Sequence, residues 1–374
     1  MRIGIDVTAS IYSGTGVASY YRSLVPELVK QGKDCDFVLL GYAMRRFSDL
    51  LLANKKFFLP PRLMEILWNK LHIIPVETFT GDLDVFHAWD YLQPPVRKAK
   101  IVTTIHDLTT IKFPLYHRVS TVEAQRDRLR WVRREADLIL ADSRATKQDI
   151  IELLGVPETK IKVVYLAAGE QYKEFRRSSR GLSPEGIKNS ELRIKEITRL
   201  KKKYGIDGEY FISVGTLEPR KNLKRVIEAF SQVTSYKSQV TNLVIVGRAG
   251  WGEQLRPAAG VIFLGLVQDE DLPGLYAGSA GLVYPSLYEG FGLPVLEAMT
   301  VGCPVLTSGR GSLEEVVGKA AVLVDPENVE SIVWGIESLI NDREKLIAKG
   351  LKRAENFSWK KTAGEILSIY KSLC

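Results

Sequence analysis

Short apolar runs alternate with amphipathic helical stretches along nearly the whole chain, and this alternation constrains the fold more than any other feature. Six runs precede a polar segment at 173–205 and six follow it. Apolar strands joined by helices form parallel sheets whose two faces the helices cover. We therefore predict an α/β protein with two doubly wound parallel-sheet domains. The twelve expected strands lie within residues 2–8, 36–42, 84–89, 101–107, 138–143, 161–167, 210–215, 242–247, 261–265, 281–286, 304–308 and 321–325.

The polar segment separates the two expected domains. The 374 residues are enough for two domains of ordinary size. The segment holds eleven Lys and Arg against four Glu, and its first half carries Ser, Gly and Pro, as linkers do. We predict an N-terminal domain over 1–172, a basic linker over 173–205 and a C-terminal domain over 206–357. The charge of the linker is that of a solvated surface, and contact with anionic lipid head groups is the alternative.

Composition disfavours several other classes of protein. The first ten residues lack the apolar core of a secretory signal, and no stretch is long and apolar enough to span a bilayer. Cys35, Cys303 and Cys374 lie far apart and lack metal-ligand spacing, which favours a reducing compartment. We therefore expect a cytoplasmic protein. Nucleic-acid binding is disfavoured because the basic surplus lies in the linker, without interleaved aromatic residues.

Loops at the strand ends are the candidate sites, because ligands of doubly wound sheets bind beyond the carboxyl ends of the strands. Gly14 and Gly16 precede a helix and would let backbone approach a ligand, although a tight structural turn explains them equally well. His106 ends an apolar strand and is a catalytic candidate, although a lone histidine is more often structural. Asp82 and Asp84 resemble a metal-binding pair but precede a strand, so we predict no metal site there.

In the second half, a strand ending at Gly215 is followed by Arg220 and Lys221 at the start of an amphipathic helix. Two cations in a glycine-containing loop form a site for a doubly charged anion such as a diphosphate. Purely structural cations would be poorly placed there, because the positive end of a helix dipole disfavours them. We therefore expect a negative group beside them.

A second loop in this half follows the expected strand 281–286. It carries Glu289 and Glu297, with Gly290 and Gly292 between them. Backbone N–H groups of a loop and a first helical turn are free to donate, while the carboxylates can accept from hydroxyls. Together with the two cations, this loop fits a polyhydroxylated anion, and sugar nucleotides match that description.

These motifs together resemble the retaining glycosyltransferases of family 4, which have the GT-B fold. The resemblance rests on the Glu-x7-Glu pattern at 289–297, the His-Asp pair at 106–107 and the segments GTGVASY, GTLEPRKN and FSWKKTAGEILSIYKSL. It spans nearly the whole chain. It implies two Rossmann-like domains facing across a cleft, with a final helix at 358–374 that crosses back to the N-terminal domain.

The resemblance also implies roles for the candidate residues. Glu289 would face the donor sugar, and His106 would contact that sugar near its reacting carbon. Glu297 would bind the ribose of the nucleotide. Arg220 and Lys221 would neutralise the diphosphate. These implied roles make His106, Glu289, Lys221 and Arg220 the catalytic candidates.

One position departs from the family pattern. Many relatives place an arginine directly after the glycine that ends this strand, where this chain has Thr216. The second phosphate would then rely on Arg220, or on Arg248 in the loop VGRAGWGEQL. The donor-binding set implied by the resemblance is Gly14, Gly16, Gly215, Thr216, Arg248, Val267, Gly290, Phe291, Gly292, Leu293 and Glu297.

The implied reaction needs no metal and no cofactor besides the donor substrate. GTLEPRKNL and Gly250-Trp251 make the chain most similar to bacterial mannosyl- and rhamnosyltransferases of surface polysaccharide synthesis. This similarity favours GDP-mannose as donor, with UDP-glucose and dTDP-rhamnose as alternatives. A sugar-nucleotide epimerase with the same fold is a further alternative. The acceptor would be a glycan or glycolipid lying against the N-terminal domain, near residues 89–91.

The segment 43–75 suggests contact with a membrane. Basic residues alternate there with apolar ones, a composition suited to the head-group boundary of anionic lipid. Packing of the apolar residues on the N-terminal sheet is the competing interpretation. The basic residues are Arg45, Arg46, Lys55, Lys56, Arg62 and Lys70, and the apolar ones are Leu50, Leu51, Leu52, Phe57, Phe58, Leu67 and Trp68.

Overall fold

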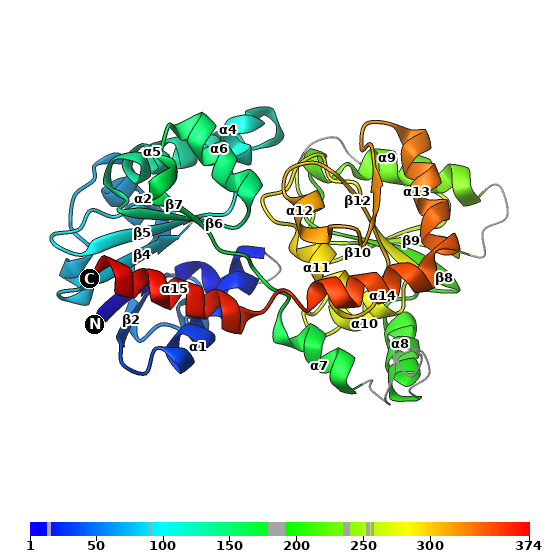
Figure 1. Ribbon diagram of the computed structural model, residues 1–374, viewed down its shortest axis with the longest axis horizontal. Helices are drawn as coiled ribbons and strands as arrows, with labels where there is room; N and C mark the ends of the chain where they lie inside the picture. The colour runs from blue at the N-terminus through cyan, green and yellow to red at the C-terminus, as the bar shows by residue number, and fades with distance from the viewer. Residues whose placement is uncertain (13–15, 90, 179–190, 235–239, 252–254, 256–257) are drawn as a thin grey trace. The chain divides into compact units, whose positions relative to one another are not determined.

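The computed structural model describes residues 1–374 except 13–15, 90, 179–190, 235–239, 252–254 and 256–257. The chain divides into two compact units, each with one sheet (Figure 1). Met1–Leu166 and Ser358–Cys374 form the N-terminal unit, and Ala167–Phe357 forms the C-terminal unit. All paired strands in both sheets are parallel, so the predicted fold class is confirmed.

The sheet of the N-terminal unit has the strand order β3-β2-β1-β4-β5-β6-β7. All six strands expected in this half are present. Sequence analysis missed β3, because its three residues include two lysines and give no apolar run. This strand pairs with the carboxyl end of β2 at the sheet edge. The strands are β1 Arg2–Asp6, β2 Asp36–Tyr42, β3 Lys55–Phe57, β4 Val85–Trp89, β5 Lys100–Ile105, β6 Leu138–Ala141 and β7 Ile161–Val163.

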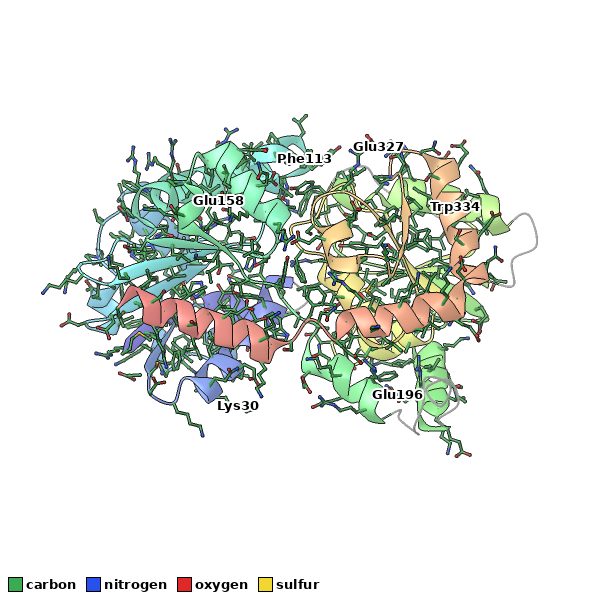
Figure 2. The ribbon with its side chains drawn as sticks, in the orientation of Figure 1. Lys30, Phe113, Glu158, Glu196, Glu327 and Trp334 are labelled. Atoms are coloured by element: carbon green, nitrogen blue, oxygen red, sulfur yellow. The ribbon has the colours of Figure 1, made fainter. Side chains whose placement is uncertain are left out.

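Helices of the N-terminal unit pack against this sheet, and long charged side chains such as Lys30 and Glu158 extend from the surface (Figure 2). The helix that ends the chain, α15, packs beside α1 in this unit (Figure 1). The Ser358 hydroxyl caps α15 by accepting from the Lys361 amide, as N-cap serines do. The longer helices are α1 Gly16–Gln31, α5 Val119–Glu135, α6 Arg144–Leu154 and α15 Trp359–Leu373, and the shorter ones are α2 Pro61–Glu65, a π-helical turn Ile66–Lys70, α3 Glu77–Thr80 and α4 Thr109–Lys112.

The C-terminal unit has a six-stranded sheet in the order β10-β9-β8-β11-β12-β13. The strand order reverses between β8 and β11, and ligands of doubly wound sheets bind at such a switch point. The loops after these two strands carry Lys221 and Glu289. All six strands expected in this half are present: β8 Glu209–Val214, β9 Val240–Val246, β10 Val261–Gly265, β11 Gly281–Tyr284, β12 Val305–Ser308 and β13 Val322–Val324.

Helices α9 and α13 cover one face of this sheet, and α10, α11 and α14 cover the other (Figure 1). The unit begins at Ala167, five residues before residue 172, where we predicted the first domain to end. Tyr172 of α7 is buried beside Tyr276 of α10, which ties this stretch to the C-terminal unit. The helices are α7 Glu170–Ser178, α8 Glu191–Lys203, α9 Leu223–Thr234, α10 Leu272–Ala277, α11 Leu293–Thr300, α12 Leu313–Val317, α13 Val329–Asn341 and α14 Arg343–Ala354.

The segment 43–75 is divided between core and surface. Leu50 and Trp68 are fully buried, and Phe57 and Leu67 pack against the core cluster that contains Trp68. The interpretation of these four side chains as membrane-facing is therefore wrong, because they fill the N-terminal core. Leu51 and Phe58 are exposed. No helix in the described part of the chain is both long and apolar enough to cross a membrane.

Candidate active site

The loop after β8 is held close to the loop after β9 by backbone hydrogen bonds. Gly215 has a φ of +146°, and a Cβ there would lie 3.0 Å from Lys221 Cε. Its amide donates to the Val246 carbonyl at 2.9 Å, and the Leu217 amide donates to the Arg248 carbonyl at 3.1 Å. The backbone of Thr216 and that of Arg248 are therefore neighbours, as a shared phosphate site would require.

Asn222 fixes the end of the same loop. It follows a 3₁₀ turn over Pro219–Lys221 and adopts a left-handed conformation with a φ of +59°. Its side-chain amide donates to the carbonyls of Pro285 and Pro326. Because Pro285 directly follows β11, this residue joins the two loops at the switch point.

Four charged side chains meet where these loops come together. We call Glu218, Arg220, Lys221 and Glu289 the charge cluster. Arg220 donates to both carboxylates, and Lys221 Nζ lies 2.7 Å from Glu289 Oε1. Each of the four side chains is at most 11% exposed. The chain itself thus supplies two negative partners for the two cations.

Hydroxyl groups complete the surroundings of Glu289. Tyr284 OH lies 2.8 Å from Glu289 Oε1, and Ser286 Oγ also donates to this oxygen. Burial acts to raise the pKa of Glu289, but the charges of Arg220 and Lys221 and these hydrogen bonds lower it to about 2. Burial lowers the pKa of Lys221, with Glu289 opposing that shift. Glu289 is therefore an ionised carboxylate that can only accept hydrogen bonds near neutral pH.

The loop from Glu289 to α11 is closely packed. Gly311 has a φ of +61°, and a Cβ there would lie 2.5 Å from the Glu289 carbonyl oxygen. The Ser312 amide and hydroxyl both donate to that oxygen. Gly292 caps α11 with a φ of +95°, and proline stands in the first turn of the helix as expected. These contacts restrict movement of the Glu289 backbone.

Glu297 lies on α11 in a different environment from Glu289. It is half-buried, and Tyr276 OH lies 3.3 Å from its Oε2. Burial raises the pKa of Glu297 to about 7, although the hydroxyls of Tyr172 on α7 and of Tyr276 oppose the shift. The two glutamates therefore differ in charge state, since Glu297 titrates near neutral pH and Glu289 does not.

The remaining residues of the donor-binding set occupy varied positions. Phe291 packs its ring against Phe357, so only its backbone could face a ligand. Gly290 is buried, Leu293 is partly exposed at the start of α11, and Val267 is partly exposed after β10. Gly14 lies outside the described residues.

The N-terminal unit contains the other candidates. His106 Nδ1 lies 2.6 Å from Asp142 Oδ2, so the residues that follow β5 and β6 form one pair. The Tyr20 ring stands edge-on to the imidazole at 4.8 Å. Gly16 is the first residue of α1. His106 is therefore an oriented, largely buried histidine, as a positioned catalytic group would be.

The sequence analysis missed several residues that contact the two glutamates or Arg220. Glu218 could have been found, because it is a carboxylate two residues before Arg220. Tyr284 and Ser286 lie at a strand end and resemble ordinary strand residues. Tyr172 and Tyr276 come from helices far apart in sequence, so only the fold brings them to Glu297.

No group of three or more His, Cys, Asp or Glu side chains that could hold a metal ion occurs among the described residues.

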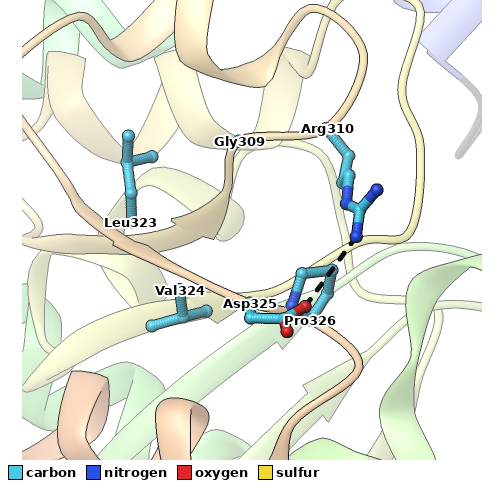
Figure 3. A pocket seen from close by; sticks show the side chains of 6 residues that line it. All are labelled: Gly309, Arg310, Leu323, Val324, Asp325 and Pro326. Carbon is cyan, nitrogen blue, oxygen red and sulfur yellow. Dashed lines mark ion pairs between the residues drawn. The ribbon is translucent and has the colours of Figure 1, made fainter.

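An open pocket of about 440 Å³ lies beyond β12 and β13, where Arg310 Nη2 is 3.9 Å from Asp325 Oδ1 (Figure 3). None of the predicted site residues lines this pocket. Its lining residues are Gly309, Arg310, Leu323, Val324, Asp325 and Pro326.

Comparison with known proteins identifies the class of the chain. The model of glycosyl transferases group 1 matches residues 196–356, and the model of glycosyltransferase family 4 matches residues 14–167. The structure of Anabaena HepE in complex with UDP and glucose has a TM-score of 0.69 to this chain at 20% identity, and the match covers 100% of both chains. The two sheets, the switch-point loops and these matches define a glycosyltransferase of the GT-B fold.

Relatives in sequence identify the family. O-antigen chain mannosyltransferase B of Escherichia coli is 34% identical over 301 residues, which cover 77% of this chain and 74% of that protein. The serotype-specific mannosyltransferase WbdA of Escherichia coli is 32% identical over 242 residues, which are 61% of this chain and 28% of that protein. The chain belongs to the family 4 glycosyltransferases, with a group 1 domain in its C-terminal unit.

Proposed function

We propose that the chain is a retaining, metal-independent mannosyltransferase that takes mannose from GDP-mannose. The acceptor is a hydroxyl of a glycan or of a lipid-linked glycan in surface polysaccharide synthesis. The observation that carries the choice of sugar is the 34% identity to O-antigen chain mannosyltransferase B over most of both chains. The charge cluster carries the proposed chemistry.

The donor diphosphate binds by replacing Glu289 as the partner of the cations. Lys221 and Arg220 together carry two positive charges, and a diphosphate offers oxygen atoms of matching charge. Release of Glu289 from Lys221 frees Oε1 to accept from a sugar hydroxyl. Glu218 stays on Arg220 and keeps the guanidinium in place.

The two glutamates then divide the donor between them. Glu289 binds the sugar, and Glu297 accepts from the ribose. Ser286 and Tyr284 hold the Glu289 carboxylate in position throughout. His106, oriented by Asp142, contacts the sugar near its anomeric carbon.

The reaction is a displacement on one face of the sugar. The acceptor oxygen forms a bond to the anomeric carbon on the face that the diphosphate leaves, so the configuration is retained. The bond from that carbon to the diphosphate oxygen breaks, and its electron pair stays on the diphosphate. The acceptor proton passes to an oxygen of the leaving diphosphate. Stabilisation of the leaving group by one preorganised donor is worth on the order of 10²–10³ in rate.

We attribute the proposed metal independence to the same two side chains. Lys221 and Arg220 supply the positive charge that a divalent cation would otherwise bring to the diphosphate. We therefore expect transfer to continue in the presence of EDTA.

A lipid-linked acceptor requires the enzyme to reach a membrane. We propose peripheral contact between the N-terminal unit and an anionic bilayer, through the exposed part of the segment 43–75. Basic side chains near an anionic surface each contribute about 1 kcal/mol.

A panel of GDP-mannose, UDP-glucose and dTDP-rhamnose tests the donor. A ligand at 100 times its dissociation constant stabilises the folded chain by about 2.7 kcal/mol, so the preferred donor raises the melting temperature most. We expect GDP-mannose to give the largest shift and the only transfer product. A larger shift with another donor would contradict the choice of GDP-mannose. Release of nucleotide without any acceptor would instead indicate an epimerase.

A further inference from the structure

We propose that the loop 71–74 of the N-terminal unit inserts into the head-group boundary of an anionic phospholipid bilayer. This inference rests on the membrane contact of the proposed function and names the element that makes it. It is independent of the identity of the donor.

The loop places a run of apolar side chains in solvent. Leu71, Ile73 and Ile74 are 57%, 47% and 37% exposed. Leu63 and Ile66 are also exposed, three residues apart on one side of the helical segment that leads into the loop. Five large apolar side chains within twelve residues are thus exposed, and clustered exposed apolar residues mark interaction sites.

Two residues of the loop have a left-handed backbone conformation, which residues with a side chain rarely adopt. His72 and Ile74 have φ values of +53° and +63°. A β-branched residue in this region is an outlier, and such strain persists only where the surrounding structure imposes it. The exposure of Ile73 and Ile74 is therefore a fixed feature of the fold.

Hydrogen bonds and stacking impose this conformation. His72 Nδ1 lies 2.8 Å from the Trp68 carbonyl, and Nε2 lies 2.8 Å from a Glu135 carboxylate oxygen. The imidazole stacks on the Trp131 ring, with centroids 3.7 Å apart and planes 5° apart. Trp68 Nε1 donates to the Ile74 carbonyl at 2.9 Å. The loop is thus braced against both the core and α5.

Basic residues surround the braced loop. Arg62 and Lys70 flank it on the helical segment and are exposed. The guanidinium carbons of Arg130 and Arg134 lie 4.8 and 5.5 Å from the centroid of the Trp131 ring. This is the ring on which the His72 imidazole stacks. An apolar centre with a cationic rim is complementary to a bilayer with anionic head groups. The four cations outnumber the two carboxylates beside them, Glu65 on the helical segment and Glu135 on His72.

Sedimentation of the full-length chain with vesicles tests the proposal, without donor or acceptor present. Vesicles of phosphatidylglycerol with phosphatidylcholine are compared with vesicles of phosphatidylcholine alone. We expect binding to the anionic vesicles that weakens with salt. Ile73→Asp should lower the partition coefficient about tenfold, because an apolar side chain no longer enters the boundary. Arg130→Ser with Arg134→Ser should lower it about fivefold per residue.

Leu115→Asp is the matched control, because Leu115 is 94% exposed in the same unit but lies outside the loop. It should bind vesicles as the unmodified chain does. Circular dichroism and the melting temperature show whether each variant folds, and Ile66→Asp replaces Ile73→Asp if the latter does not fold.

Three results would overturn the proposal. The first is no binding to anionic vesicles at low salt, and the second is equal losses for Ile73→Asp and Leu115→Asp. The third is a dimer in light scattering that Ile73→Asp converts to a monomer, which would assign the loop to a protein interface. Nucleotide binding measured on the same variants separates this outcome from a failure of the proposed transferase function.

Discussion

Lys221 Nζ lies 2.7 Å from Glu289 Oε1, and both side chains are at most 11% exposed. The two residues that we assign to the diphosphate and to the sugar are therefore partners of each other. Removal of one partner of a buried ion pair leaves the other charge uncompensated. Substitution of either residue should therefore change both ligand binding and stability. Binding of ligands with and without a diphosphate distinguishes the two effects.

Glu289→Gln should reduce transfer by about 10²–10³ without weakening the affinity for GDP. The amide no longer competes as an anion for Lys221 and Arg220, so the diphosphate gains access to both cations. Calorimetry with GDP and a transfer assay measure the two effects. Glu314→Gln is the control, because Glu314 is an exposed carboxylate on nearby α12. Full activity in a folded Glu289→Gln variant would refute the role of this carboxylate.

Lys221→Ala should weaken the binding of both GDP-mannose and GDP by about 10- to 100-fold, since a charge-assisted hydrogen bond contributes about 1.5–3 kcal/mol. Guanosine should bind as before, because it has no phosphate to lose a partner. Lys224→Ala on the exposed side of α9 is the control. Equal losses for all three ligands in calorimetry would indicate a disordered loop instead of a lost phosphate contact.

The pKa of Glu297 predicts a dependence of stability on pH. This pKa is about 7 in the folded chain, against 4.5 for an unperturbed glutamate. Between these values the unfolded chain is ionised and the folded chain is protonated, so unfolding releases a proton. The free energy of unfolding therefore falls as pH rises from about 4.5 to 7, by on the order of 1–3 kcal/mol.

Urea denaturation of the unmodified chain and of Glu297→Gln at pH 5 and pH 8 measures this effect. The stability of the variant relative to the unmodified chain should be higher at pH 8 than at pH 5, because glutamine does not titrate. An unchanged difference between the two pH values would mean that Glu297 has an ordinary pKa.

The end of α15 should contribute to the stability of the N-terminal unit. Tyr370 OH hydrogen-bonds His87 Nδ1, and both side chains are fully buried. Burial lowers the pKa of His87 well below its usual value, so the imidazole is neutral near pH 7. Tyr370→Phe removes this hydrogen bond and should cost about 1–3 kcal/mol. Urea denaturation measures the cost. Tyr91→Phe in the same unit is the control, because Tyr91 is 52% exposed and its substitution should leave stability almost unchanged.

Short apolar runs predicted the strands well, because a parallel strand buried on both faces consists mostly of apolar residues, whichever strands it pairs with. All twelve expected strands are present. Strand β3 was not predicted, because its residues, Lys55, Lys56 and Phe57, do not form an apolar run. It is a strand only because it pairs with β2 at the sheet edge.

The candidate site was less accessible to sequence reasoning. Arg220, Lys221 and Glu289 were identified by motif, and the structure brings them together. The sequence did not reveal that Arg220 is shared between Glu218 and Glu289, because that depends on how two loops meet at the switch point. The same limit applies to Glu297, whose raised pKa depends on burial between α7, α10 and α11.

The configuration of the product at the anomeric carbon tests the central proposal most directly. GDP-mannose labelled with carbon-13 at that position is incubated with the enzyme and a mannose-terminated glycan acceptor, with EDTA present. The coupling between the anomeric carbon and its proton, measured by NMR, distinguishes the α from the β product. Because GDP-mannose carries an α linkage, we expect an α-mannoside, formed by the unmodified chain and by Glu314→Gln but not by Glu289→Gln. A β-mannoside would contradict the retaining mechanism, and an α-mannoside formed equally well by Glu289→Gln would contradict the role of the charge cluster.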